Sequence, residues 1–202
     1  MKDCCDVRPV ESRQRRILIA VLAANAIMFA IEVVAAVVAH STALLADSAD
    51  MLGDVIVYAF SLYVIGRGAV WQARAALLKG GVMALFGAGV LLEVVSKLVS
   101  DVKPDGGIMS AVGLLALTVN AAVLAALWRH RADDLNMRSV WLCSRNDVVA
   151  NGAVLLAALG VMRTSSVWPD ILVGFAIAGL FIGSAVDVVR AALSRVAVSR
   201  SG

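Results

Sequence analysis

Six apolar stretches, joined by short polar or charged connections, dominate this sequence. Each is close to the roughly 20 residues that a helix needs to cross the hydrocarbon core of a membrane. They are rich in Ala, Val, Leu and Gly and lack the ten-residue alternating pattern of membrane barrels. We therefore predict an all-α membrane protein, a six-helix transmembrane bundle. The stretches are Ile17 to Ala39, Ser41 to Gly66, Gly80 to Val99, Ile108 to Trp128, Ser139 to Met162 and Pro169 to Val189.

Composition supports this class and argues against a soluble domain. Of the 202 residues, 61% are hydrophobic and 16% are charged, whereas soluble domains carry roughly a quarter charged residues. Six spans leave no room for a large additional domain. We expect the lipid bilayer as the surrounding medium and no nucleic-acid partner. The expected organisation is an N-terminal tail of residues 1–16, a six-helix transmembrane domain of residues 17–192 and a C-terminal tail of residues 193–202.

The distribution of Lys and Arg predicts the orientation in the membrane. Six spans place both termini on one side, and most of the 18 Lys and Arg residues fall on that side. Only Lys97, Lys103 and Arg163 fall near the opposite loops, and Arg145 lies within the fifth span. Because cytoplasmic loops carry the excess of positive charge, we predict that both termini are cytoplasmic. The expected location is a cell membrane, in particular a bacterial cytoplasmic membrane.

Seven acidic residues interrupt the apolar stretches. A carboxylate at the centre of a spanning helix costs on the order of 3 kcal/mol on insertion scales. A set of them therefore needs protons, a cationic partner or a bound cation, and a functional interior is the default interpretation. The seven are Glu32, Asp47, Asp50, Asp54, Glu93, Asp147 and Asp187.

Four residues on two spans form a candidate metal site. Asp50 and Asp54 are four residues apart, which places their carboxylates on one helix face, about 6 Å apart. Cys143 and Asp147 repeat this spacing on the fifth span. Three carboxylates and one thiolate suit a tetrahedral, borderline-soft cation such as zinc or cadmium better than magnesium or calcium. We predict a bound divalent metal ion, zinc first, and no cofactor.

Five further polar residues are candidates for a second shell or an ion pathway. Asp47 shares the helix face of the paired aspartates, Glu32 follows Asn25 by seven residues, and Asn146 and Asn151 lie near the fifth-span face. The functional interpretation is a water-filled vestibule that conducts ions or protons. The structural interpretation is a set of hydrogen bonds between helices.

Each of these sites also has a purely structural explanation. The paired aspartates could form ion pairs with Arg145 or Arg67, and Cys143 could be a small buried hydrophobic residue. The adjacent Cys4 and Cys5 of the tail could capture a soft metal, but two cysteines alone are a weak signal.

Two segments carry a family resemblance. The stretch from Ser41, STALLADSADMLGDV, and the stretch from Leu135, LNMRSVWLCSRNDVVANGAVL, resemble the second and fifth helices of the cation diffusion facilitator family. Members of that family are six-helix exporters of divalent metals, usually coupled to protons. The resemblance extends weakly from about residue 17 to about residue 195. It implies a homodimer and an alternating-access mechanism with proton antiport.

The resemblance also assigns the ligands, with two departures. In the family an acidic or histidine residue and an aspartate four residues later bind the ion on the second helix, and these fall on Asp50 and Asp54. The fifth-helix pair of His and Asp falls on Cys143 and Asp147. Cysteine thus replaces the usual histidine, which changes both metal preference and proton handling. The cytoplasmic metal-binding domain that commonly follows the sixth helix is expected to be lacking, because the sequence stops at Gly202.

Two other functions compete with transport. An intramembrane enzyme of the CDP-alcohol phosphotransferase type also uses helical aspartates, but its motif needs a Gly after the second Asp, followed soon by Ala-Arg. Here Asp50 is followed by Met51 and no such Arg follows. We therefore expect no enzymatic activity. A non-transporting membrane partner, whose polar residues only hold helices together, is the third interpretation.

Overall fold

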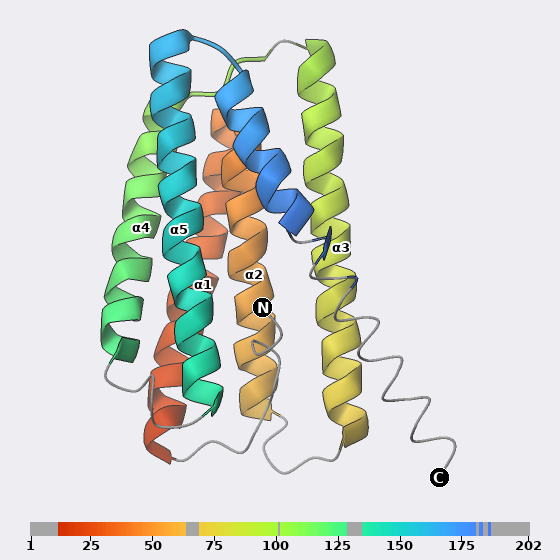
Figure 1. Ribbon diagram of the computed structural model, residues 1–202, viewed down its shortest axis with the longest axis vertical. Coiled ribbons are helices and arrows are strands. Elements are labelled where there is room, and N and C mark those ends of the chain that lie inside the picture. The colour runs from red at the N-terminus through yellow and green to blue at the C-terminus, as the bar shows by residue number, and fades with distance from the viewer. Residues whose placement is uncertain are drawn as a thin grey trace.

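The apolar stretches form helices throughout the part of the chain that the computed structural model describes, residues 12–63, 69–100, 102–128, 135–180, 182–183 and 186. No strand occurs among these residues, which confirms the predicted all-α bundle (Figure 1). Five helices are followed by a shorter one, which we call the C-terminal helix. They are α1 (Ser12–Ala39), α2 (Thr42–Tyr63), α3 (Ala69–Ser100), α4 (Gly106–Trp128), α5 (Leu135–Thr164) and the C-terminal helix (Trp168–Leu180).

The second helix lies at the centre of the bundle. It packs against α1, α3 and α5, and α4 packs mainly against α5 (Figure 1). The C-terminal helix crosses in front of α2 toward α3. We call the end at which α1 turns into α2, and α5 into the C-terminal helix, the upper end, as drawn in Figure 1. Residues of α2 therefore face neighbours on several sides, which makes its polar side chains interior ones.

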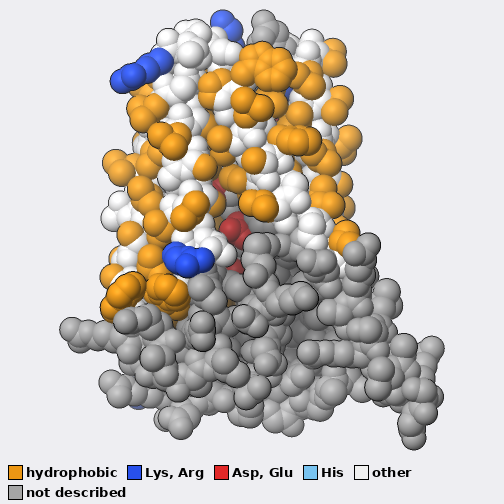
Figure 2. Space-filling view, viewed as in Figure 1, with side chains coloured by type: hydrophobic (Ala, Val, Ile, Leu, Met, Phe, Trp, Pro, Cys, Tyr) orange, Lys and Arg blue, Asp and Glu red, His pale blue; other side chains and the backbone are white. Residues whose placement is uncertain are grey.

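Polarity is inverted relative to a soluble protein. Large apolar side chains such as Leu92, Val149 and Leu156 are exposed, and orange hydrophobic atoms cover much of the described surface in Figure 2. Many polar side chains, in contrast, are buried between the helices. Within the described residues, three segments are long and apolar enough to cross a membrane: Arg15–Ala39, Gly106–Trp128 and Ser144–Thr164. This arrangement is that of a chain whose outer surface faces lipid.

Hydrogen bonds at the upper end make α1 stop sharply and α2 start at once. His40 has a positive φ of 49°, its N–H donates to the carbonyl of Val37 (3.3 Å), and the Ser41 N–H donates to the carbonyl of Ala36 (2.9 Å). These two bonds form a Schellman cap. The Asp105 N–H donates to the carbonyl of Ala39 (2.9 Å), which fixes the start of α4 beside the end of α1.

Helix bounds differ from the apolar stretches mainly where polar residues remain helical. The third helix begins at Ala69 rather than Gly80, and the fifth begins at Leu135 rather than Ser139. Ala, Arg, Gln and Leu in these added segments are strong helix formers, so the helices extend beyond the apolar stretch. The predictions for Cys4, Cys5, Arg67, Asp187 and both tails concern residues outside the described part, apart from 12–16 at the start of α1.

Candidate metal-transport site

The central helix brings its aspartates into the interior at mid-height. Asp47 and Asp54 are buried, and Asp50 is half-buried. Because the three are spaced by three and four residues, they follow one face of α2. Red acidic atoms are visible at mid-height of the bundle in Figure 2, among apolar and neutral atoms. The carboxylates therefore lie deep within the span.

The fifth helix adds a carboxylate to this face. Asp147 is buried, interacts electrostatically with Asp54, Asp50 and Asp47, and shares a side-chain hydrogen bond with Asp50. The structure thus brings Asp50, Asp54 and Asp147 together from two helices.

The fourth predicted ligand falls outside this description. Cys143 lies in α5, four residues before Asp147, but the position of its side chain is not among the described features. Among the side chains that are described, no three from His, Cys, Asp and Glu are arranged so that they could hold a metal ion. The four-residue metal site therefore remains a prediction.

Tyr58 is a neighbour of the site that sequence reasoning missed. Its buried hydroxyl donates a hydrogen bond to Oδ2 of Asp54, at 2.9 Å. The signal was present, because Tyr58 follows Asp54 by four residues and so lies on the same helix face. This contact orients one of the predicted ligands.

A second polar layer lies nearer the upper end. Asn151 of α5 is fully buried, and its Nδ2 donates to the backbone carbonyl of Asp147 (2.7 Å) and to Oδ1 of Asp47 (3.5 Å). Glu32 of α1 is also fully buried and interacts electrostatically with Asp47 and Asp50. Three helices therefore contribute to this layer, and the structure brings Glu32 and Asn151 close to Asp47.

The two remaining candidates, Asn25 and Asn146, differ in burial. Asn25 is buried on α1, seven residues before Glu32 as the spacing requires. Asn146, in contrast, is exposed, so the structure does not place it with the acidic residues. One residue corresponds to a rotation of about 100° on a helix, and this turns Asn146 away from the face of Asp147. Arg145 is exposed too, with its guanidinium over the Trp141 ring, 5.7 Å from the centroid.

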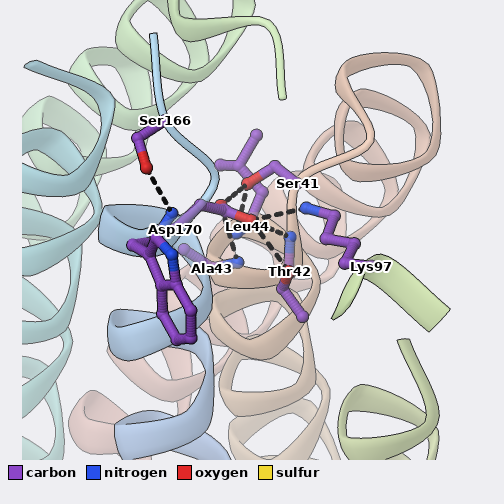
Figure 3. Close-up of polar contacts among 8 residues, drawn as sticks. Ser41, Thr42, Ala43, Leu44, Lys97, Ser166 and Asp170 are labelled. Carbon is purple, nitrogen blue, oxygen red and sulfur yellow. Dashed lines mark hydrogen bonds and ion pairs between the residues drawn. The ribbon is translucent and has the colours of Figure 1, made fainter. Parts of the chain in front are cut away.

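A buried ionic cluster at the upper end was not anticipated. The carboxylate of Asp170, in the C-terminal helix, receives the N–H groups of Thr42 and Ala43 at the start of α2 (2.8 and 3.1 Å). It also accepts the hydroxyls of Ser41 (2.6 Å) and Thr42 (2.8 Å), as Figure 3 shows. The first N–H groups of a helix lack intrahelical partners and favour a negative charge. Asp170 thus caps α2 from another helix.

The same carboxylate is neutralised from α3. Nζ of Lys97 lies 2.6 Å from Oδ2 of Asp170, and both side chains are almost fully buried (Figure 3). We call Lys97, Asp170 and the first residues of α2 the upper clamp. A lysine near the end of a membrane-spanning helix often extends its charge into water at the membrane surface. Lys97 does not, because its side chain is buried. The upper clamp joins α2, α3 and the C-terminal helix.

Buried carboxylates inside a bundle with a lipid-facing surface define a class, that of integral membrane proteins that handle cations within the bilayer. Comparison with protein families assigns the chain within that class. The model of the cation efflux transmembrane domain matches residues 18–196, nearly the whole sequence. The chain belongs to this family, the cation diffusion facilitators, and is a multi-pass metal-cation transporter of that type rather than an enzyme. Comparison with individual curated proteins finds no match.

Proposed function

We propose that this protein exports a divalent transition metal and binds it between α2 and α5. The observation that supports this most directly is the meeting of Asp147 with Asp50 and Asp54 in the bundle interior. Buried carboxylates that repel one another are costly unless a proton or cation neutralises them. A doubly charged ion would do so for two of them at once.

Zinc is the proposed substrate, with cadmium as an alternative. The proposal rests on Cys143 as fourth ligand, because a thiolate beside carboxylates favours borderline-soft tetrahedral ions. Magnesium and calcium prefer more ligands, all of them oxygen. A Cys143→His variant should shift relative transport from cadmium toward zinc.

Proton antiport follows from the chemistry of these ligands. Metal binds the deprotonated groups, so binding expels protons and reprotonation lowers affinity. The proximity of Asp147 to Asp50 and Asp54 supports this, because carboxylates this close repel one another unless protons or a cation neutralise them. Metal would bind from the less acidic cytoplasm and leave toward the more acidic side.

Alternating access is supported by the packing of the upper end. Small side chains of α1, α2 and α5 fill the space between the polar layers and the upper clamp, so this half of the bundle is closed. With the termini in the cytoplasm, as the distribution of Lys and Arg predicts, the upper end faces the opposite side. Release there requires α2 to part from its neighbours. The side chains include Ala35, Ala36, Ala39, Ala43, Ala46, Ala157 and Ala158.

We further propose a bacterial cytoplasmic membrane as the location and a homodimer as the assembly. The dimer rests on the family alone. Gly179 and Gly183 permit it, because a Cβ at either residue would meet no atom within 4 Å among the described contacts. Small residues four apart allow two helix backbones to approach closely in lipid.

Transport into inverted vesicles tests the function. Such vesicles expose the cytoplasmic face, so zinc should accumulate inside, and faster when the interior is acidic. Asp54→Asn should abolish this uptake, whereas Glu93→Gln, which removes a partly buried acid of α3, should retain it. Zinc flux indifferent both to the pH gradient and to Asp54→Asn would contradict the proposal.

A further inference from the structure

Four buried oxygen atoms in the second polar layer have no hydrogen-bond partner within the described structure. They are both carboxylate oxygens of Glu32, Oδ2 of Asp47 and the amide oxygen Oδ1 of Asn151. All three side chains have 0% exposure. Buried polar atoms are nearly always hydrogen-bonded, and leaving one unpartnered costs about 1–3 kcal/mol or more. Hydrogen bonds between helices therefore satisfy only part of this layer, through the contact of Asn151 with Asp47.

The three residues come from three helices and lie near one another. The amide of Asn151 contacts Asp47 (3.5 Å). The Glu32 carboxylate interacts electrostatically with both Asp47 and Asp50, and more strongly with Asp47. The second helix begins at the upper end and α5 ends there (Figure 1). Asp47, three residues before Asp50, and Asn151, four residues after Asp147, therefore both lie nearer the upper end than the predicted ligands. Each step is about 5–6 Å along a helix. The layer thus sits one turn above the predicted metal site.

We propose that Glu32, Asp47 and Asn151 form a second, all-oxygen site that receives the divalent cation after it leaves the lower site. This inference rests on the proposed function. Two carboxylates neutralise a divalent ion, and the amide oxygen supplies a further ligand of the same hard type. Without sulfur, the upper site holds zinc or cadmium more weakly than the lower one. The cation would therefore move from a selective site to a weaker one nearer the point of release.

The different donor atoms of the two sites allow them to be probed separately. Cd²⁺ reports on the sulfur-containing lower site, and Mn²⁺, a harder ion, reports on the oxygen-only upper site. Bound ions per chain are counted by equilibrium dialysis of the purified full-length protein, with Mn²⁺ also followed by electron paramagnetic resonance. In Asp54→Asn, Cd²⁺ binding should be lost while Mn²⁺ binding remains.

Glu32→Gln is the decisive variant, because it keeps the shape and removes the charge. Alone or combined with Asp54→Asn, it should weaken Mn²⁺ binding by roughly tenfold or more, which corresponds to about 1.4 kcal/mol. Cd²⁺ affinity in Glu32→Gln alone should stay close to that of the unmodified chain. Glu93→Gln is the matched control and should leave both ions unaffected. Asp47→Asn gives a second test of the same site if Glu32→Gln does not fold.

The outcomes separate the two proposals. Mn²⁺ binding that is absent in the unmodified chain, or unchanged in both Glu32→Gln and Asp47→Asn, overturns the upper site and leaves the lower one standing. Failure of the unmodified chain to bind Cd²⁺, with Mn²⁺ bound and lost in Glu32→Gln, overturns the lower site only. Absence of both ions overturns both.

Discussion

Single side chains decide how well the predicted ligands are oriented. The carboxylate of Asp54 accepts a hydrogen bond from the Tyr58 hydroxyl at 2.9 Å. Partners of this kind fix a ligand before the ion arrives, so less conformational freedom is lost on binding. The carboxylate of Asp54 therefore has a defined hydrogen-bond partner in addition to its acidic neighbours.

Tyr58→Phe tests the role of one such neighbour. Loss of the hydroxyl leaves Asp54 less well oriented, and removal of a ligand's hydrogen-bond partner typically costs 10–100-fold in metal affinity. We expect Cd²⁺ affinity to fall by roughly tenfold, measured by titration of the purified protein. Unchanged affinity, in a variant that stays folded by circular dichroism, would show that Tyr58 does not orient Asp54.

Helices of this protein are held together at the upper end by charge as well as by packing. The carboxylate of Asp170 satisfies two N–H groups at the start of α2 while pairing with Lys97 of α3. Close backbone packing accompanies it, because a Cβ at Gly174 would lie 2.9 Å from the backbone carbon of Thr42. The helix that carries the predicted ligands is thus fixed where it begins.

Removing one charge of the upper clamp should be strongly destabilising. Asp170→Asn leaves Lys97 buried without its counter-charge, and breaking a buried pair costs about 3–5 kcal/mol. Adding Lys97→Met should recover part of this loss. Lys103→Met, at an exposed lysine near the same end, is the control and should change little. Equal unfolding free energies for Asp170→Asn and Lys103→Met would contradict a stabilising clamp.

Two glycines of the C-terminal helix should respond differently to alanine. Gly174→Ala forces a methyl group against the backbone of Thr42, and overpacking of this kind costs about 1–3 kcal/mol. Gly179→Ala meets no atom within 4 Å among the described contacts, so it should not destabilise the chain. Thermal unfolding of both variants in detergent measures the difference. A loss of stability for Gly179→Ala but not for Gly174→Ala would contradict this expectation.

The whole molecule is a lipid-facing bundle with a polar interior that is closed at one end. Apolar side chains face outward, carboxylates occupy the middle, and small apolar side chains followed by the upper clamp fill the upper end. Repulsion among the buried acids opposes folding unless protons or a cation neutralise them. We therefore expect the stability of the protein to depend on the ions whose transport we propose.

Metal should stabilise the folded protein as a whole. An ion that binds only the folded state raises the free energy of unfolding, by about 2.7 kcal/mol at 100 times its dissociation constant. We expect zinc and cadmium to raise the thermal midpoint of the unmodified chain and to do so much less for Asp54→Asn. Magnesium at equal concentration serves as the control. Equal stabilisation by all three ions would contradict a sulfur-containing site.

Much of the fold and part of the site were predictable from spacing along the chain. Six apolar stretches indicated the helices, and intervals of three and four residues placed Asp47, Asp50 and Asp54 on one face, because the geometry of a helix is local. Tyr58 could have been found by the same rule. Asn146 lies off the predicted face and is exposed, because one residue before Asp147 corresponds to a rotation of about 100° on a helix.

The sequence by itself determined that this chain is a helical membrane protein with acids at mid-span, since apolar length and residue spacing need no knowledge of neighbours. Only the tertiary structure decided that Asp170 would cap α2 and pair with Lys97, and that Asp47 would meet both Glu32 and Asn151. These contacts join residues far apart in the chain. They depend on which helices pack together and at what height, and neither is encoded in the period of a single helix.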